Sequence, residues 1–293
     1  MMKIDTHIHA APQRIEKEAS PWNPQACYCA EPEELIAHLR SQGIGKAILM
    51  SGGETDHREL VGNAACRRMA AEHPGVLYWM CNFDPDAPET VMDRMKRYRD
   101  MGAVGVGELM INRWIDDPMI QEIFRCAEIL EMPVTFHMSP EPGYSYGICD
   151  RAGLPLLEES LRRYPGLKFF GHSQVFWLEI SADCPKESNA QRSGMGRGRV
   201  IPGRIGELMD RYANLYCDLS AFSGSMAILR DPKYGLSFLE KYQDRLCYAT
   251  DTMNRHETFP LGRFLDELAQ RGALRQEAYE KIAWRNAENI YRI

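Results

Sequence analysis

The chain begins with the stretch "KIDTHIHA", residues 3–10, in which a short apolar run leads into two histidines one residue apart. A strand period of two would place His7 and His9 on one face, together with Asp5. Alone, the pair has two interpretations: ordinary strand residues, or two ligands of one metal ion whose partners lie further along the chain. The rest of the sequence favours the second interpretation.

Seven more apolar runs follow at the spacing of one strand–helix unit, and amphipathic helical patterns lie between them. The runs cover residues 46–52, 76–83, 103–110, 133–139, 168–174, 215–222 and 246–253. Apolar strands that alternate with helices predict an α/β fold with a parallel sheet and helices outside it. Eight units without a spare segment favour a closed (β/α)₈ TIM barrel, with residues 1–293 as a single domain. A doubly wound open sheet is the alternative, but no glycine-rich phosphate loop follows the first run.

Composition narrows the class of protein. The 293 residues are 44% hydrophobic and 26% charged, with a net charge of −6, which is typical of a soluble globular protein without affinity for nucleic acid or anionic membranes. Asp5 interrupts the position of a signal-peptide core, and no apolar run reaches membrane-spanning length, so we expect a cytoplasmic protein. Nine irregularly spaced cysteines indicate reduced, mostly buried thiols. The close pair Cys27 and Cys29 is expected to be structural.

Polar residues gather at the ends of the predicted strands. The first strand ends with His7 and His9, and later strands end with Glu108, His137, His172 and Asp251. Each alone has an ordinary explanation, such as a core histidine or an aspartate that caps a helix. A barrel, however, brings all its strand ends around one axis, and nitrogen and oxygen donors suit Zn²⁺, Mn²⁺ or Fe²⁺. Their coincidence therefore predicts a metal site.

The order "HIH", then His137, His172 and Asp251, resembles the metal-dependent amidohydrolase superfamily. The chain is most similar to its amidohydrolase-related branch, which includes aminocarboxymuconate semialdehyde decarboxylase, aromatic-acid decarboxylases and lactone or amide hydrolases. The resemblance spans Asp5 to Asp251. It implies that His7, His9, His137 and Asp251 bind a catalytic divalent ion, with Zn²⁺ expected first and Mn²⁺ or Fe²⁺ as alternatives. It also implies that His172 contacts the metal-bound water or the substrate.

Glu108 departs from the nearest relatives. The stretch "VGVGEL", residues 104–109, is more similar to the fourth strand of the TatD-like deoxyribonucleases, where a glutamate bridges two metals. The ordinary alternative is a charge at a strand end that pairs with a nearby arginine such as Arg113. One ion and two ions both stay open.

The resemblance implies three functions. The first is a hydrolase of a lactone, amide or ester, in which Asp251 would accept the proton of the attacking water and His172 would stabilise the oxyanion. The second is a nonoxidative decarboxylase of an unsaturated or aromatic acid. The third, a catalytically silent barrel that binds a metabolite, is disfavoured because Asp251 and His172 are both present.

The long segment from Val175 to Gly203 follows the sixth strand and predicts a loop over the site. It carries arginines, of which Arg197 and Arg199 are predicted to bind a small anionic substrate through its carboxylate. The aromatic residues Tyr144 and Trp177 are predicted to stack on a planar group. The alternatives are a solvated basic loop and aromatic residues that pack the loops down. The resemblance also leaves open a homo-oligomer.

Overall fold

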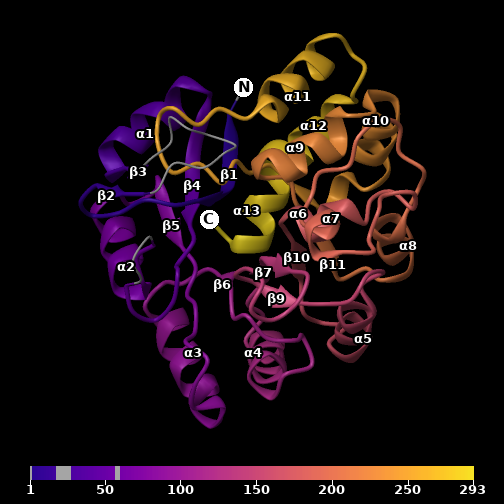
Figure 1. The fold of residues 1–293 in the computed structure, drawn as a ribbon. Coiled ribbons are helices and arrows are strands. Elements are labelled where there is room, and N and C mark those ends of the chain that lie inside the picture. Colours follow the sequence, from indigo (N-terminus) through magenta and orange to yellow (C-terminus); the bar gives the residue numbers. More distant parts are fainter. Residues whose placement is uncertain (1, 18–27, 57–59) are drawn as a thin grey trace.

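The computed structural model describes residues 2–17, 28–56 and 60–293, and its strands alternate with helices along the chain (Figure 1). Each of the eight predicted runs overlaps one strand of the barrel. They are β1 (Lys3–Ile8), β4 (Ile44–Leu49), β5 (Leu77–Trp79), β6 (Val106–Leu109), β7 (Val134–Phe136), β10 (Phe169–Gly171), β11 (Leu215–Asp218) and β12 (Leu246–Cys247).

These strands run parallel and form a closed ring. Continuous ladders join β1, β4 and β5, and they also join β6, β7, β10, β11 and β12 in that order. Parallel bridges complete the ring where Cys81 pairs with Val106 and Ile8 pairs with Thr252. Backbone hydrogen bonds cross the second seam, because the Asp251 N–H donates to the carbonyl of His7. The predicted (β/α)₈ barrel is confirmed.

The longer helices surround this ring (Figure 1). The helices are α1 (Pro32–Ser41), α2 (Asn63–Glu72), α3 (Val91–Asp100), α4 (Pro118–Ile129), α5 (Pro155–Arg163), α6 (Gln174–Leu178), α7 (Asn189–Arg192), α8 (Arg204–Arg211), α9 (Ala221–Leu229), α10 (Pro232–Lys241), α11 (Pro260–Gln270), α12 (Gln276–Glu280) and α13 (Asn286–Tyr291). A π-helical turn, Lys281–Arg285, joins α12 to α13. Five helices begin with proline, whose fixed φ suits the first helical position.

Two short pairings lie outside the ring. β2 (Ile15–Glu16) pairs antiparallel with β3 (Tyr28–Cys29), and β8 (Met138–Ser139) pairs in parallel with β9 (Ile148–Cys149). The second pairing closes the base of the loop that follows β7. The loop predicted over residues 175–203 instead contains two short helices, α6 and α7.

The predicted seventh strand was too long at its C-terminal end. The run 215–222 was expected to be one strand, but β11 ends at Asp218 and α9 begins at Ala221. The physical reason is local: the Asp218 carboxylate accepts a hydrogen bond from the backbone N–H of Ser220 at 2.8 Å. Such a bond between a side chain and the backbone two residues on turns the chain out of the strand.

An apolar cluster fills the barrel below its polar end. It includes Ile4 of β1, Phe170 of β10 and Cys247 of β12, together with Tyr291 of α13. Figure 1 shows α13, in yellow, inside the ring in this view. Ile4 precedes His7 on its strand, as Phe170 precedes His172, so α13 closes the end opposite these histidines.

The alternation of inward-facing and outward-facing side chains along strand β1 shifts between Ile4, in the apolar cluster, and His7. Its register with β4 shifts on both sides of Ile4 and Asp5, so that Ile4 and His7 both face the interior despite their odd spacing. Asp5 does not join the histidines, contrary to the simple alternation. Its carboxylate accepts hydrogen bonds from the Thr250 hydroxyl at 2.6 Å and the Thr250 N–H at 3.0 Å, and so fastens β1 to β12.

The eight cysteines in the described ranges are buried free thiols, as predicted, and Cys27 lies outside those ranges. Burial raises the pKa of the Cys29 thiol to about 12, which agrees with a structural role. Within the described part of the chain, none of the helices combines the length and the apolar character needed to cross a membrane.

Candidate metal centre

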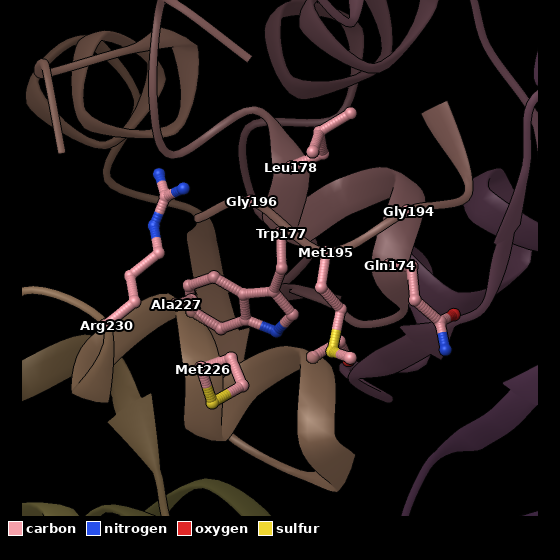
Figure 2. A pocket seen from close by; sticks show the side chains of 10 residues that line it. Gln174, Trp177, Leu178, Gly194, Met195, Gly196, Met226, Ala227 and Arg230 are labelled. Carbon is pink, nitrogen blue, oxygen red and sulfur yellow. The ribbon is translucent and has the colours of Figure 1, made fainter. Parts of the chain in front are cut away.

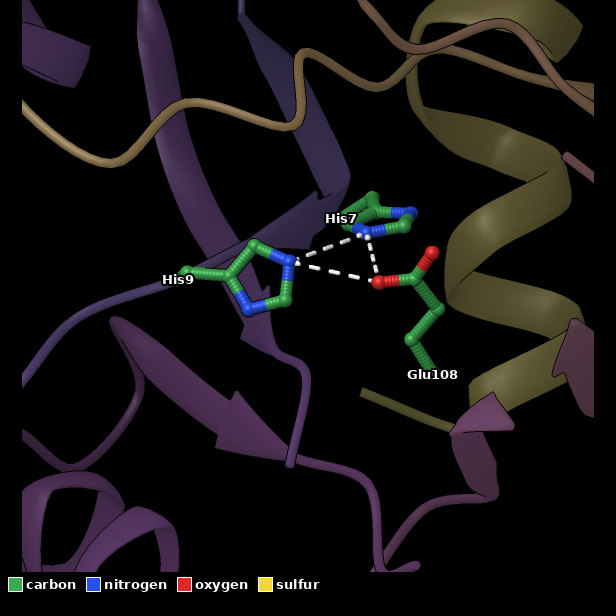
Figure 3. A group of neighbouring side chains, drawn as sticks. All are labelled: His7, His9 and Glu108. Atoms are coloured by element: carbon green, nitrogen blue, oxygen red, sulfur yellow. Dashed lines mark hydrogen bonds and ion pairs between the residues drawn. The ribbon is translucent and has the colours of Figure 1, made fainter. Parts of the chain in front are cut away.

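Four side chains from three strands meet at the C-terminal end of the barrel, and Figure 3 shows His7, His9 and Glu108 among them. The Nε2 atoms of His7 and His9 lie 3.3 Å apart. Glu108 of β6 places Oε2 at 3.6 Å from the first of these nitrogens and 3.5 Å from the second. Asp251, which follows β12, places Oδ1 at 3.4 and 3.3 Å from the same two atoms.

These distances match the ligand shell of one small cation. A tetrahedral ion with bonds of about 2.1 Å holds its ligand atoms about 3.4 Å apart. The five separations above lie between 3.3 and 3.6 Å. The donor set of two imidazoles and two carboxylates is one that Zn²⁺, Mn²⁺ and Fe²⁺ accept. His7, His9 and Glu108 also meet the spacing expected of a metal-binding group.

The electrostatics of the cluster also fit a cation. Burial opposes ionisation of Glu108, but His137, together with His7 and His9, outweighs burial and holds the pKa of Glu108 well below its ordinary value. Burial likewise opposes a charge on His7, but Asp218 and Asp251 outweigh burial and raise the pKa of His7 well above its ordinary value. The carboxylates thus favour positive charge at this point, which a divalent ion would supply while both histidines stay neutral.

Asp218, at the end of β11, orients His7 from behind. Its Oδ2 lies 2.7 Å from His7 Nδ1, so His7 donates Nδ1–H and turns the lone pair of Nε2 towards the cluster. The other imidazole differs, because His9 Nδ1 is buried and has no hydrogen-bond partner among the described residues. Of the two histidines, His7 is therefore the one whose orientation is fixed by Asp218.

The second oxygen of Glu108 faces a different group of side chains. Glu108 Oε1 lies 2.7 Å from His137 Nδ1 and 3.5 Å from His172 Nε2. These three residues also meet the spacing of a metal-binding group. His137 was predicted to bind the same ion as His7 and His9. It contacts the Glu108 carboxylate instead of these two histidines. The arrangement of one carboxylate between two groups of histidines is the arrangement that a bridging ligand requires.

His172 connects the two sides of the centre. Its Nε2 lies 3.8 Å from Asp251 Oδ2, and its Nδ1 lies 2.8 Å from the Ser220 hydroxyl. Burial, reinforced by the charge of His7, lowers the pKa of His172. Asp251 itself has a positive φ of 63°, a conformation that aspartate tolerates better than most residues and that often marks a functional site.

A cavity of about 470 Å³ opens beside the cluster. Its polar residues include His9, Glu108 and Asp251 of the cluster, with Asn82 and Asn112. Its described lining is completed by Lys17, Gly52, Leu60, Phe83, Asp84, Pro85, Met110, Ile111, Tyr146 and Met253. The volume is that of a small-molecule site, and several walls are apolar.

Comparison with known proteins assigns the chain to a family. Residues 4–293 match the model of the amidohydrolase family. The chain belongs to that family. Membership of this family indicates an enzyme, and the groups of histidines and carboxylates described above could hold its metal. No curated protein matches the chain by sequence.

Three solved structures show the same fold at low sequence identity. The 2,6-dihydroxybenzoate decarboxylase from Rhizobium is 13% identical with a TM-score of 0.64, over 100% of this chain and 99% of that one. A dihydroxybenzoic acid decarboxylase from Polaromonas, with bound manganese and 2-nitroresorcinol, is 15% identical with a TM-score of 0.59, over 99% and 96%. A probable 2-pyrone-4,6-dicarboxylic acid hydrolase from Acinetobacter baumannii, with citric acid bound, is 16% identical with a TM-score of 0.58, over 100% of both chains.

The residues predicted to bind substrate in this amidohydrolase do not lie at the cavity. Arg197 and Arg199 are exposed and are not among its lining residues, and the carbonyl of Arg197 accepts a hydrogen bond from Arg230. Tyr144 is exposed and also outside the lining. Trp177 is buried in α6, where its Nε1–H donates to the carbonyl of Asp218.

Figure 2 shows the surroundings of Trp177, beside Met195, Met226 and Arg230. This second cavity holds only about 10 Å³, which is too small for a substrate. The indole therefore packs the protein interior, and the predicted stacking role of Trp177 is corrected. The physical reason is that α6 turns its apolar side chains into the barrel wall directly after β10.

Two residues at the site were not predicted: Asp218, which orients His7, and Lys17, which lines the cavity. Asp218 had a visible signal, because it ends an apolar run just as Asp251 does. Lys17 is the only lysine or arginine in the described lining, and it comes from the loop after β1, where the sequence has no distinctive pattern. Tyr146, an aromatic residue of the same loop as Tyr144 that could also stack on a planar ring, does line the cavity.

Replacing Asp218 with asparagine should weaken metal binding without loss of the fold. The asparagine side chain could present its amide nitrogen to His7 and would no longer fix the tautomer, so we expect about a 10- to 100-fold loss of affinity. Competition against a fluorescent chelator measures it. Asp150→Asn is the control, because Asp150 is another buried aspartate and its carboxylate accepts hydrogen bonds from backbone N–H groups of Arg151, Leu156 and Leu157 instead of a histidine. Wild-type affinity in Asp218→Asn would contradict the orienting role.

Proposed function

We propose that this amidohydrolase hydrolyses a small, carboxylate-bearing lactone, amide or ester with the help of divalent metal. The observation that carries the proposal is the position of Asp251. One of its oxygens lies among the ligand atoms, the other lies 3.8 Å from His172 Nε2, and the residue lines the cavity. A carboxylate in this position can bind metal and still exchange a proton with a molecule in the cavity.

Metal bound at the cluster would lower the pKa of a water ligand and polarise the substrate carbonyl. Asp251 accepts the proton of the attacking water and passes it to the leaving oxygen or nitrogen. His172 donates Nε2–H to the oxygen that becomes negative, which requires its Nδ1 to accept a hydrogen bond from Ser220. The lowered pKa of His172 supports this role, because a neutral imidazole keeps one nitrogen as donor and the other as acceptor.

Glu108 supports a centre with two ions rather than one. Oε2 belongs to the group of His7, His9 and Asp251, and Oε1 lies 2.7 Å from His137 Nδ1, so His137 is the histidine that would share the second ion with Glu108. His172, whose Nε2 lies 3.5 Å from Oε1, keeps its proton for the substrate. Zn²⁺ suits the first group because of its tetrahedral spacing and its mixed nitrogen and oxygen donors. Mn²⁺, the metal of the Polaromonas structure, and Fe²⁺ are the alternatives.

Lys17 supports a substrate that carries a carboxylate. The described lining has one cationic side chain away from the metal cluster, and Leu60, Phe83 and Ile111 supply apolar surface beside it. A carboxylate at Lys17 would leave the reacting carbonyl free to reach the cluster. The loop arginines, in contrast, lie outside the cavity lining.

Decarboxylation is the second candidate, and the apolar lining favours it. A carboxylate surrounded by Phe83, Met110 and Ile111 would lose hydration, and this loss disfavours the charged acid relative to neutral CO₂. In that case the substrate carboxylate would lie at the cluster instead of at Lys17. The two reactions thus differ in which end of the molecule approaches the metal.

The reaction is tested in water enriched in ¹⁸O. Carboxylate-bearing lactones, N-acyl amides and aryl esters are screened beside hydroxybenzoic acids, and products are read by mass spectrometry. We expect one ¹⁸O atom from water in the carboxylic acid formed at each turnover, and no CO₂. Asp251→Asn should retain its fold and lower kcat by at least about 100-fold, since the proton acceptor is lost. Release of CO₂ with no ¹⁸O in the product would contradict hydrolysis and show that the reaction is decarboxylation.

The number of ions is tested by elemental analysis after dialysis against Zn²⁺. We expect two ions per chain in the wild type and one in Glu108→Gln, because glutamine lacks the second anionic oxygen that bridges the two groups. Glu179→Gln, at a buried glutamate that binds Gly153 and Lys186 instead, is the matched control and should keep both ions. One ion in the wild type would contradict bridging by Glu108.

Replacing Lys17 with methionine keeps most of the aliphatic stem and removes the charge. We expect KM for a carboxylate-bearing substrate to rise about 10-fold or more, which is the effect of losing a hydrogen bond to a charged group. KM for the methyl ester of the same substrate should stay unchanged. Arg197→Met and Arg199→Met are the controls and should match the wild type. A rise in KM in the two arginine variants but not in Lys17→Met would place the anion-binding site in the loop after β10 and contradict the role of Lys17.

A further inference from the structure

The loop between β8 and β9 is closed at its base. Met138 and Ser139 pair with Ile148 and Cys149, so residues 140–147 leave and re-enter the same point of the fold. The Ser139 hydroxyl accepts hydrogen bonds from the Ser145 N–H at 3.3 Å and the Ser145 hydroxyl at 3.0 Å. The loop is therefore held by its own side chains, as in compact Ω-type loops.

Arg192 of α7 clamps both ends of this loop. It is only 8% exposed, and its Nη1 and Nη2 donate to the carbonyls of Pro140 and Asp150 at 2.8 and 2.7 Å. A buried guanidinium that uses two donors on backbone carbonyls holds them at a fixed separation. The neighbouring Asn189 side chain donates to Glu141 in the same loop. Thus the segment after β10 holds the loop after β7 in place.

Gly147 lets the loop approach the metal centre closely. Its φ is +108°, and a Cβ at this position would lie 2.7 Å from the carbonyl oxygen of His137. Any other residue would be strained in this conformation and would push the loop away. Asn112 also anchors the loop, because its Nδ2 donates to the Gly147 carbonyl at 3.0 Å.

Tyr146 is the residue that this fixed loop presents to the cavity. Its ring centroid lies 4.2 Å from that of His137, at an interplanar angle of 41°. It lines the cavity, yet 58% of it is exposed. An aromatic side chain that is held in place beside a reactive centre and is more than half exposed is suited to contact a bound ligand.

We propose that Tyr146 is a specificity-determining residue that selects substrates with a planar group next to the reacting carbon, and that Arg192 is the residue that positions it. The inference uses the proposed function only in taking the cavity as the substrate site. A flat acid or acyl group can lie against the phenol ring while its oxygen atoms reach the cluster. A puckered ring of the same size and charge cannot make the same contact.

Binding to the full-length protein tests the role of Tyr146 without any turnover. Benzoate and cyclohexanecarboxylate share charge and carbon number but differ in planarity, and calorimetry gives Kd for each. We expect the wild type to prefer benzoate by about 3- to 10-fold, which is the range of an aromatic pair. Tyr146→Phe should keep the preference and Tyr146→Leu should abolish it.

Tyr144→Leu is the matched control, because Tyr144 lies in the same loop, is also exposed and lies outside the lining. It should keep the wild-type preference. Absence of a preference in the wild type, or a preference that survives in Tyr146→Leu, would overturn the proposal. Neither outcome depends on hydrolysis, so failure of the ¹⁸O experiment is a separate result.

A double-mutant cycle tests the positioning role of Arg192. We expect Arg192→Lys, which retains a charge but not the two-pronged geometry, to reduce the benzoate preference to that of Tyr146→Leu. The double variant should then show no further loss, because the first change acts through Tyr146. Metal content should match the wild type in all variants. Additive losses, or an unchanged preference in Arg192→Lys, would refute positioning by this residue.

Discussion

The arrangement of the strand ends is organised around one electrostatic constraint: lone pairs of His7, His9, Glu108 and Asp251 meet at separations of 3.3 to 3.6 Å, and such atoms stay together only around positive charge. The surrounding fold is arranged to maintain this meeting point. Burial removes the competing water, and Asp218 fixes the imidazole of His7 from behind. A buried cluster of this kind contributes little to the fold by itself, and its arrangement is explained by the ion that it can bind.

Closure of the barrel makes the meeting point. His7 and Asp251 come from opposite ends of the sequence, and they become neighbours because β1 and β12 are joined at one seam. The Asp251 N–H donates to the His7 carbonyl, and Asp5 fastens the same seam through Thr250. A slip of one residue here would turn the paired histidines away from the carboxylate. The geometry of the ligands therefore depends directly on closure of the ring between β1 and β12.

The barrel and most of the cluster could be predicted because they follow from short-range rules. Period two predicts that His7 and His9 act together, and apolar runs predict where Glu108 and Asp251 end their strands. The loops obey no such rule. Arg192 lies in the segment whose arginines suggested an anion site, but it donates to the carbonyls of Pro140 and Asp150, which lie in a different loop. Trp177 was placed in the wrong environment because α6 had not been recognised.

The metal centre concentrates negative charge in the interior of the protein. Glu108, Asp251 and Asp218 bring three carboxylates to a buried centre, and burial is outweighed by neighbouring histidines in lowering the pKa of each. One divalent ion balances two of these charges. The third favours a second cation on the side of Glu108 that faces His137 and His172, which is also the side that Tyr146 borders. If both proposals hold, the number of ions and the shape of the substrate are linked, because a group that rests on Tyr146 would lie next to the second ion.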